Sequence, residues 1–286
     1  MPRPIILGVV GDSATGKTTI TDALVNLLGK ENVAHVGTDD YHKYDRQQRK
    51  ELGITPLNPE CNYMDIMAQD IEHLRRGDPL LKPVYVHSDG TFAPPEYVEP
   101  KPFAIVEGLL GYYTEELRNA HDVRVFLAPP EEVRRQWKID RDSSKRGYTE
   151  EEVLEDLDKR EPDSEAFIRP QRRHADIIVS YVPADEEWSV LDAEMTLQEG
   201  LSHPDFSQIA GDGGEGVAVE DKDGHRVVRV SGNIDPGEAR AIEEGVWDEM
   251  HFAKHLRTED LGLYDHGGGT ERSESLAIVQ VLLLYH

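Results

Sequence analysis

A glycine-rich run near the N-terminus contains the residue types that bind the phosphates of a nucleotide. Residues 11–18 read GDSATGKT and match the pattern G-x-x-x-x-G-K-[ST]. In this pattern the loop amides face the β-phosphate, Lys17 reaches the β- and γ-phosphates, and the Thr18 hydroxyl can bind Mg²⁺. The sequence therefore predicts a nucleoside-triphosphate site. Its residues are Gly11, Asp12, Ser13, Ala14, Thr15, Gly16, Lys17, Thr18 and Thr19.

Acidic residues follow two other apolar runs and are candidates for completing a magnesium site. Glu107 follows residues 103–106, and Asp39 and Asp40 follow residues 33–36. Ligands of α/β sheets bind at the carboxyl ends of the strands, where these carboxylates are expected. Mg²⁺ prefers oxygen ligands and keeps several waters. For any one of these acids the alternative is a helix cap or a solvated loop.

Basic residues are spaced for one face of a helix predicted over residues 131–145. Arg134, Lys138, Arg141 and Lys145 recur at intervals of four, three and four. Such a stripe is either a solvated face with ion pairs or a surface turned toward an anionic ligand. The segment 40–100 also carries arginine and histidine, which favour a phosphorylated sugar as the phosphate acceptor over a neutral nucleoside.

The elements that position these residues alternate along the chain. Apolar runs at 5–10, 33–36, 103–106, 123–127 and 177–182 are typical of buried strands, and helical patterns separate them. The fold class is therefore α/β, with a P-loop NTPase-type, mostly parallel sheet flanked by helices. Thr149 and Glu152 form a capping box for a helix expected to end before Pro162.

The C-terminal part is expected to extend this core. Residues 201–216 have the composition of a loop, 217–220 and 226–230 flank a hairpin turn, Asp235 and Pro236 open a long helix, and 273–286 form a terminal helix. We expect a kinase core over 1–200 and an extension over 201–286 packed on the same domain.

Composition excludes several classes of function. The net charge is −25, which argues against binding to nucleic acid or anionic membranes. No run of 18 apolar residues or secretion signal is present, so a cytoplasmic location is expected. Cys61 is the only cysteine, which excludes an internal disulfide.

Several motifs resemble those of phosphoribulokinases, within the wider family of phosphoribulokinases and uridine kinases, and most closely the plant and cyanobacterial form. The resemblance covers about the first 180 residues. The matching runs are GDSATGKTT at 11–19, TDDYHKYDR at 38–46, KPVYVH at 82–87, VEGLLGYY at 106–113, WKIDRDSSKRGY at 137–148 and RPQRRHADIIV at 169–179. The family resemblance implies phosphorylation of the C1 hydroxyl of ribulose 5-phosphate by ATP with Mg²⁺.

The resemblance also implies roles for individual residues. Asp39 is the expected general base, and Lys17 is also expected in the catalytic set. Lys138, Arg141 and Arg146 are expected to stabilise the transferring charge, and Asp142 to orient the neighbouring cations. Residues expected to bind the sugar phosphate are His42, Arg46, Tyr85, His87, Lys138, Arg141 and Arg146. Thr18, Glu107 and Asp39 are the expected magnesium ligands. Arg134 and Lys145 match no motif position and are expected at the surface.

One departure from the family pattern concerns regulation. The plant-type enzyme is switched by a disulfide whose first cysteine lies in the phosphate loop, where this sequence has Thr15. We therefore expect no redox switch and no redox regulatory partner, while the resemblance implies a homodimer.

Two alternatives stay open. One is a uridine kinase or another sugar-phosphate kinase of the same family, and the other is a nucleotide-binding regulator without turnover.

Overall fold

The computed structural model describes residues 3–185, 188, 190–205, 216–256, 258, 260–266 and 269–286. The chain divides into two compact units. The first consists of Met1–Lys17, Gly29–Leu127 and Arg134–Ala175, and the second of Thr18–Leu28, Ala128–Val133 and Asp176–His286. The boundary predicted at residue 200 stays a prediction.

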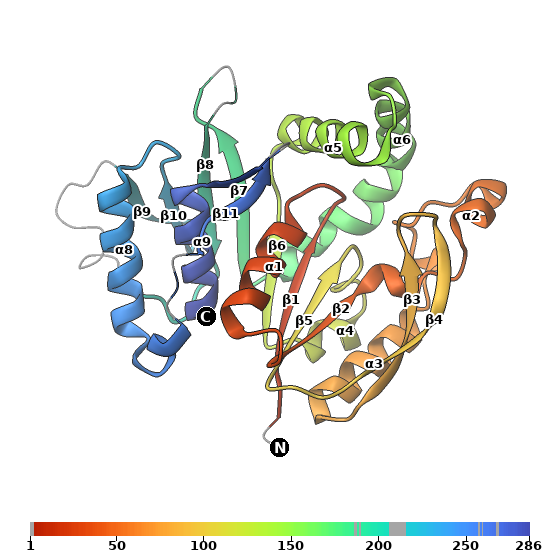
Figure 1. The fold of residues 1–286 in the computed structure, drawn as a ribbon, viewed down its shortest axis with the longest axis horizontal. Helices are drawn as coiled ribbons and strands as arrows, with labels where there is room; N and C mark the ends of the chain where they lie inside the picture. The colour runs from red at the N-terminus through yellow and green to blue at the C-terminus, as the bar shows by residue number, and fades with distance from the viewer. Residues whose placement is uncertain are drawn as a thin grey trace. The chain divides into compact units, whose positions relative to one another are not determined.

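The sheet of the first unit is parallel and has the strand order β2-β5-β1-β6 (Figure 1). The strands are β1 (Ile5–Gly11), β2 (Val33–Gly37), β5 (Phe103–Gly108) and β6 (Val123–Leu127). Val9, Val36 and Val125 are fully buried, as expected for a sheet covered on both faces. Glu107 pairs in register with Val9 on one side and Gly37 on the other, so its side chain lies at the carboxyl edge of the sheet. The predicted α/β class is confirmed.

Between β2 and β5 the chain forms elements that the apolar pattern did not predict. They are the 3₁₀ turn η1 (Thr38–Tyr41), α2 (Arg46–Leu52), the 3₁₀ turn η2 (Pro59–Cys61), α3 (Met64–Arg76), β3 (Leu80–Val86) and β4 (Thr91–Val98). Strands β3 and β4 pair as a separate antiparallel hairpin with an irregularity between Lys82 and Val84. Pro83 lies at that irregularity, because proline has no amide for the ladder.

Two helices and two shorter turns complete the part of the first unit that bears on the site. They are α5 (Glu131–Arg146), α6 (Glu150–Asp163), the π-helical turn η3 (Ser164–Ile168) and the 3₁₀ helix η4 (Arg169–His174). The capping box of Thr149 and Glu152 is confirmed. The predicted end of α6 before Pro162 is wrong, because Pro162 lies inside the helix. Proline has no amide to donate to the helix, and α6 continues directly into the wider π-helical turn η3.

The second unit contains α1 (Lys17–Leu28, whose first residue belongs to the first unit) and an antiparallel sheet of order β7-β8-β10-β9. Its strands are β7 (Ile177–Pro183), β8 (Leu191–Leu197), β9 (Val217–Lys222) and β10 (His225–Val230). Asp223 and Gly224, both with positive φ, form the tight turn of the predicted hairpin. Residues 206–215 of the predicted loop lie outside the described residues.

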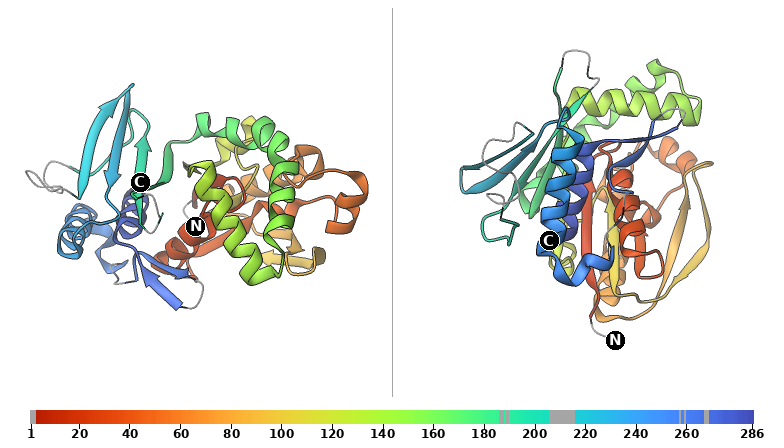
Figure 2. Two further views of the ribbon diagram at one scale, coloured as in Figure 1. Left: turned by 90° about the horizontal axis from the view of Figure 1, so that it is seen from above. Right: turned by 60° about the vertical axis from the view of Figure 1, so that its left-hand side comes forward.

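The predicted C-terminal helices of the second unit are confirmed as α8 (Pro236–Glu249) and α9 (Glu274–Tyr285), which pack against each other beside β8 (Figure 2). Between them lie the 3₁₀ helix η5 (His251–Leu256) and a small hairpin of β11 (Leu263–His266) and β12 (Gly269–Arg272). No helix among the described residues has the length and apolar character needed to span a membrane.

Candidate active site

The phosphate loop connects β1 to α1 and is folded around the side chain of Lys17. Its Nζ donates hydrogen bonds to the carbonyl oxygens of Gly11 (3.0 Å) and Asp12 (2.7 Å). Ala14 and Gly16 have φ values of 64° and 88°, the left-handed conformation that aims successive peptide groups into one concavity. A Cβ at Gly11 would lie 2.7 Å from the Leu127 carbonyl oxygen, so only glycine fits where the loop leaves the strand.

Charged side chains from separate segments of the first unit surround Lys17. Burial lowers the pKa of Lys17, the carboxylates of Glu107, Asp39 and Asp12 act in the opposite direction, and Arg141 lowers it further. These interactions require proximity, since they fall off with distance. The structure therefore brings together Lys17, Asp39, Glu107 and Arg141, which the sequence assigned to one site.

Asp39 lies in the turn η1, at the end of β2. Its Oδ1 is 4.0 Å from Nε2 of His42, and its Oδ2 is 3.7 Å from Nε2 of His87. The side chain of Asp39 is 33% exposed, whereas that of His42 is buried. The carboxylate thus lies near two imidazoles, and its charge also acts on Lys17.

Asp40, the neighbouring candidate, has a different environment. Its Oδ2 is 2.7 Å from Nζ of Lys82, and its Oδ1 accepts a hydrogen bond of 2.8 Å from the backbone amide of Tyr85. Asp40 therefore fastens the β3–β4 hairpin to η1. The structure separates two adjacent aspartates that the sequence could not distinguish.

Aromatic and basic side chains from α2, the β3–β4 hairpin and the segment after η1 lie together near Asp39. We call this set, His42, Arg46, Tyr85 and His87, the hairpin wall. Tyr85 makes edge-to-face contacts with the rings of His42 (4.9 Å) and His87 (5.1 Å). Arg46 donates from Nη2 to the backbone oxygen of His87 at 2.6 Å. The predicted acceptor-binding residues His42, Arg46, Tyr85 and His87 thus lie together.

Two further residues beside this wall were given no individual role from the sequence. Arg49 is buried, donates from Nη2 to the Tyr85 hydroxyl at 2.5 Å and lies over the Tyr85 ring. In the sequence, Arg49 follows Arg46 by three residues, a spacing that places both side chains on one face of a helix. Asn62 accepts from Nδ1 of His42 at 2.7 Å, which leaves Nε2 directed at Asp39. Nothing in the sequence marked Asn62. Burial lowers the pKa of His42, while Asp39 opposes that change.

Arg141 and Lys138, two of the cations predicted on α5, have different partners. Arg141 donates from Nε to Oδ1 of Asp142 (2.8 Å), and its Nη2 lies 3.5 Å from Oγ of Ser13 in the phosphate loop. Lys138 is 2% exposed and pairs with Asp142 (2.9 Å) and Asp156 of α6 (3.2 Å). The side chains of Lys145 and Arg146 lie outside the described residues.

Asp142 holds these two cations in place. Burial acts to raise the pKa of its carboxyl, but the hydrogen bonds and charges of Arg141 and Lys138 outweigh burial and lower the pKa to about 2. The orienting role expected for Asp142 stays a prediction, and the contacts with Arg141 and Lys138 are the ones that it would need. Lys138, by contrast, is engaged with two carboxylates and does not contact the phosphate loop through any hydrogen bond described for it.

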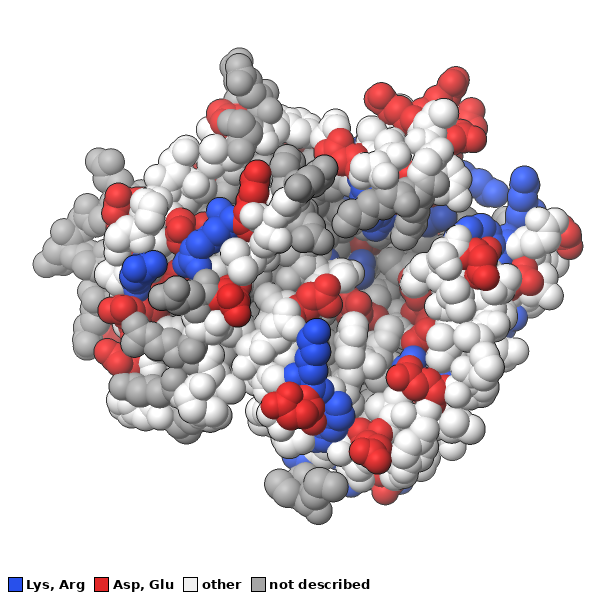
Figure 3. Space-filling model, in the orientation of Figure 1, with Lys and Arg blue, Asp and Glu red and all other residues white. Residues whose placement is uncertain are grey.

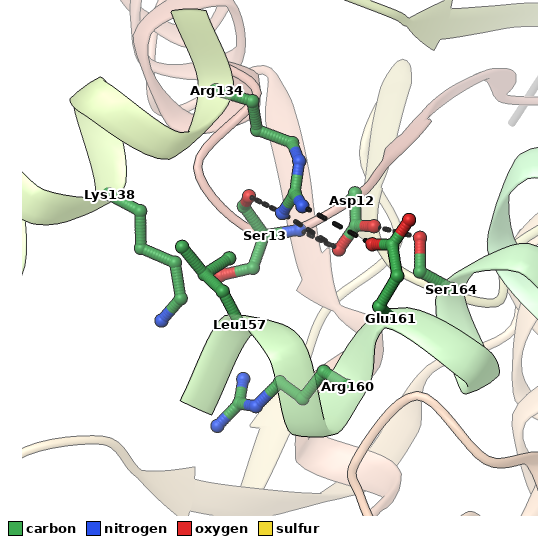
Figure 4. A pocket seen from close by; sticks show the side chains of 8 residues that line it. All are labelled: Asp12, Ser13, Arg134, Lys138, Leu157, Arg160, Glu161 and Ser164. Atoms are coloured by element: carbon green, nitrogen blue, oxygen red, sulfur yellow. Dashed lines mark hydrogen bonds and ion pairs between the residues drawn. The ribbon is translucent and has the colours of Figure 1, made fainter. Parts of the chain in front are cut away.

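The expectation that Arg134 lies at the surface is wrong. Arg134 is 4% exposed and donates from Nη1 to the carbonyl oxygen of Ser13 at 3.2 Å (Figure 4). The reason is its spacing, because Arg134, Lys138 and Arg141 share a helix face and that face is the buried one. Acidic side chains are instead exposed over α6, whose first turn contains Glu150, Glu151 and Glu152 (Figure 3).

The oxygen ligands here fit a partly hydrated magnesium ion. Glu107 and Asp39 both act on Lys17, and the magnesium ligand expected at Thr18 stays a prediction. Among the described residues, no three His, Cys, Asp or Glu side chains form a metal-binding group. Mg²⁺ in nucleotide sites takes one or two carboxylates and fills its octahedral shell with phosphate oxygens and water.

Comparisons with known proteins identify a family and several relatives of this chain. A model described as the Phosphoribulokinase / Uridine kinase family matches residues 6–187. A phosphoribulokinase from Synechocystis sp. is 39% identical over 205 residues, which are 70% of this chain and 62% of that protein. The chloroplastic phosphoribulokinase of Triticum aestivum is 32% identical over 221 residues, 70% of this chain and 55% of that protein. The chain thus spans less than two thirds of the length of these relatives.

A uridine kinase from Streptococcus gordonii is 33% identical over 181 residues, 62% of this chain and 86% of that protein. A solved phosphoribulokinase structure from Rhodobacter spheroides covers 89% of this chain and 98% of its own, with a TM-score of 0.65 at 17% identity, and therefore shares the fold. The chain belongs to the phosphoribulokinase and uridine kinase family.

Proposed function

We propose that the chain transfers the γ-phosphoryl group of ATP to the C1 hydroxyl of ribulose 5-phosphate, giving ribulose 1,5-bisphosphate and ADP. The observation that carries the proposal is the placement of Asp39, between two imidazoles and within electrostatic reach of Lys17. The names and identities of the relatives from Synechocystis and Triticum aestivum support it.

In the proposed reaction the Asp39 carboxylate accepts the proton of the acceptor hydroxyl. The hydroxyl oxygen bonds to the γ-phosphorus while the bond from that phosphorus to the β–γ bridging oxygen breaks, and the electron pair leaves on ADP. Lys17 and Arg141 stabilise the charge on the transferring group. Bound Mg²⁺, held by Thr18 and Glu107 with Asp39, would neutralise the phosphate oxygens.

The acceptor is proposed to lie against the hairpin wall of His42, Arg46, Tyr85 and His87. A phosphorylated acceptor needs cations that a neutral nucleoside does not. Arg46 lies beside His87 and Arg141 acts on Lys17, so cations lie among the residues proposed to bind the acceptor and the transferring group. This arrangement favours a sugar phosphate over uridine. Lys138 contributes by holding Asp142, and direct contact with the acceptor would require it to leave its carboxylates.

The test is an ADP-release assay with ATP, Mg²⁺ and either ribulose 5-phosphate or uridine. Turnover with ribulose 5-phosphate supports the proposal, and turnover with uridine alone would assign a nucleoside kinase. If ATP binds but no acceptor releases ADP, the chain is a nucleotide-binding regulator.

The role of Asp39 has its own test. Asp39→Asn should lower kcat by at least about 10² with ATP affinity nearly unchanged, because a general base acts in the transition state. Asp65→Asn, at an exposed position of α3, is the control and should leave kcat unchanged. An unchanged kcat in Asp39→Asn would remove Asp39 from the mechanism.

The assembly rests on the family resemblance, and the location on the sequence composition. We infer a homodimer, which light scattering in solution tests, and a small-molecule acceptor with no redox regulatory partner. The cytoplasmic location stays a prediction.

A further inference from the structure

Asp12, the second residue of the phosphate loop, is buried and bound from three sides. Its Oδ1 accepts a hydrogen bond of 2.6 Å from the Ser13 amide and lies 3.6 Å from Nη1 of Arg134. Its Oδ2 accepts a hydrogen bond from the Ser164 hydroxyl, at the start of η3. The carboxylate thus joins the phosphate loop to α5 and to the end of α6.

Arg134 makes the complementary connection. Besides donating to the Ser13 carbonyl oxygen, its Nη2 lies 4.0 Å from Oε2 of Glu161. Figure 4 shows the guanidinium directed at Asp12 and Ser13 from α5, with Glu161 and Ser164 approaching from α6 and η3. The planar fork of arginine can hold a carbonyl and two carboxylates at once, which a lysine ammonium cannot do with the same geometry.

These contacts meet at the peptide that shapes the binding loop. The carbonyl oxygen of Asp12 accepts hydrogen bonds from Nζ of Lys17 and, at 2.9 Å, from Oγ1 of Thr15. Arg134 therefore holds the carbonyl of the next residue, Ser13, immediately beside the carbonyl on which Lys17 rests. A phosphate site works by presenting amides and cations already in position, so loosening this peptide lowers affinity for the anion.

We propose that Arg134 is a positioning residue for nucleotide binding. It acts together with Asp12 and Ser164 to hold the phosphate loop against α5 and the end of α6. The inference rests on the proposed function only in that a nucleotide binds this loop, and it does not depend on which acceptor is used.

The test compares ADP affinity in Arg134→Gln, Arg134→Lys and Ser164→Ala, measured by calorimetry without any acceptor. Arg134→Gln should weaken ADP binding by about 10- to 100-fold, the usual effect of removing a buried charged hydrogen-bond donor. Arg134→Lys should be intermediate, because it restores the charge without the fork. Ser164→Ala should weaken binding by about fivefold.

The matched control is the adjacent Arg135→Gln. Arg135 pairs with Asp158 at 2.8 Å at a more exposed place, where the Asp158 side chain is 70% exposed. This variant should bind ADP within about twofold of the unchanged protein.

Two further readouts separate positioning from a general loss of structure. The KM for ATP should rise while the KM for the acceptor stays within about twofold, since the residues of the hairpin wall lie on other elements. The double variant Arg134→Gln/Ser164→Ala should lose less than the product of the single effects, because both act through Asp12.

ADP affinity within twofold of the unchanged protein in Arg134→Gln, a parallel rise in both KM values, or multiplicative single effects would each overturn the proposal. If Arg134→Gln does not fold, Arg134→Lys and Ser164→Ala still test it. Failure to turn over ribulose 5-phosphate would count against the proposed function alone, because ADP binding needs no acceptor.

Discussion

Asp142 offers a quantitative test of the electrostatics beside the phosphate loop. Its carboxylate is 3% exposed and bonds to Arg141 and Lys138 at 2.8 and 2.9 Å. Its pKa falls from the ordinary 3.8 to about 2. At about 1.4 kcal/mol per pKa unit, the ionised carboxylate contributes roughly 2 to 3 kcal/mol to the free energy of unfolding. Asp142→Asn should lower the free energy of unfolding at pH 7 by at least this amount. The loss can be larger because, of the two carboxylates described beside Lys138, Asp156 alone then remains charged.

The pH dependence has a defined sign. Because the folded pKa is lower than the unfolded one, the contribution of Asp142 is fully present above the unfolded value of 3.8 and is lost as the pH falls through about 2. The difference between the unchanged protein and Asp142→Asn should therefore be constant from pH 7 to pH 5. At pH 3 about half of it should remain.

The assay is urea unfolding at pH 7, 5 and 3, with Asp158→Asn as the control. Asp158 also pairs with an arginine of α5, but its side chain is 70% exposed, so its loss should cost at most about 0.5 kcal/mol. Two results would refute the reasoning: a loss in Asp142→Asn no larger than in Asp158→Asn, or a loss that does not shrink at pH 3.

The remaining predictions concern the hairpin wall and Cys61. Asp40→Asn should raise the KM for the acceptor without weakening ADP binding, because it releases the hairpin; Glu96→Gln, which contacts the same lysine from an exposed position, should have little effect in the same steady-state assay. Gly90→Ala should lower the melting temperature by several degrees and raise the KM for the acceptor, because Gly90 has a φ of 80° and a Cβ there would lie 2.5 Å from Cβ of Arg46. Thermal unfolding and steady-state kinetics measure the two effects, and an unchanged melting temperature and KM would contradict the prediction. Activity should not respond to dithiothreitol or mild oxidants, because burial raises the pKa of the Cys61 thiol to about 11 and no second cysteine exists; reversible inactivation on oxidation would count against it.

The strand core and the phosphate loop were predictable because each depends on a short stretch of sequence. A buried parallel strand requires a continuous apolar run, and the runs at 5–10, 103–106 and 123–127 match β1, β5 and β6 to within two residues. The loop motif lies between a strand and a helix, where its glycines and Lys17 have one workable geometry. The capping box at Thr149 was equally local.

The hairpin β3–β4 and the burial of Arg134 were not predictable in this way. The outer strand β4 is largely exposed and contains prolines, so its apolar pattern is weak. Arg134 is buried because Asp12 and Glu161, far away in the sequence, supply carboxylates on the buried face of α5. A helix pattern alone cannot distinguish a charged face that is solvated from one paired with distant acids.

The turn η1 fixes the position of Asp39, the proposed general base, through its neighbours. Three of its residues are anchored to different segments: Thr38 accepts through Oγ1 from the Leu109 amide, Asp40 binds Lys82 and the hairpin, and Tyr41 donates to Asp70 of α3. A 3₁₀ turn has little freedom once three of its side chains are held on different sides. Asp39 is then held at the carboxyl end of β2, a third exposed, near the two imidazoles and within electrostatic reach of Lys17. Its position follows from the anchoring of its neighbours, so substitutions at those neighbours should affect the acceptor step before they affect nucleotide binding.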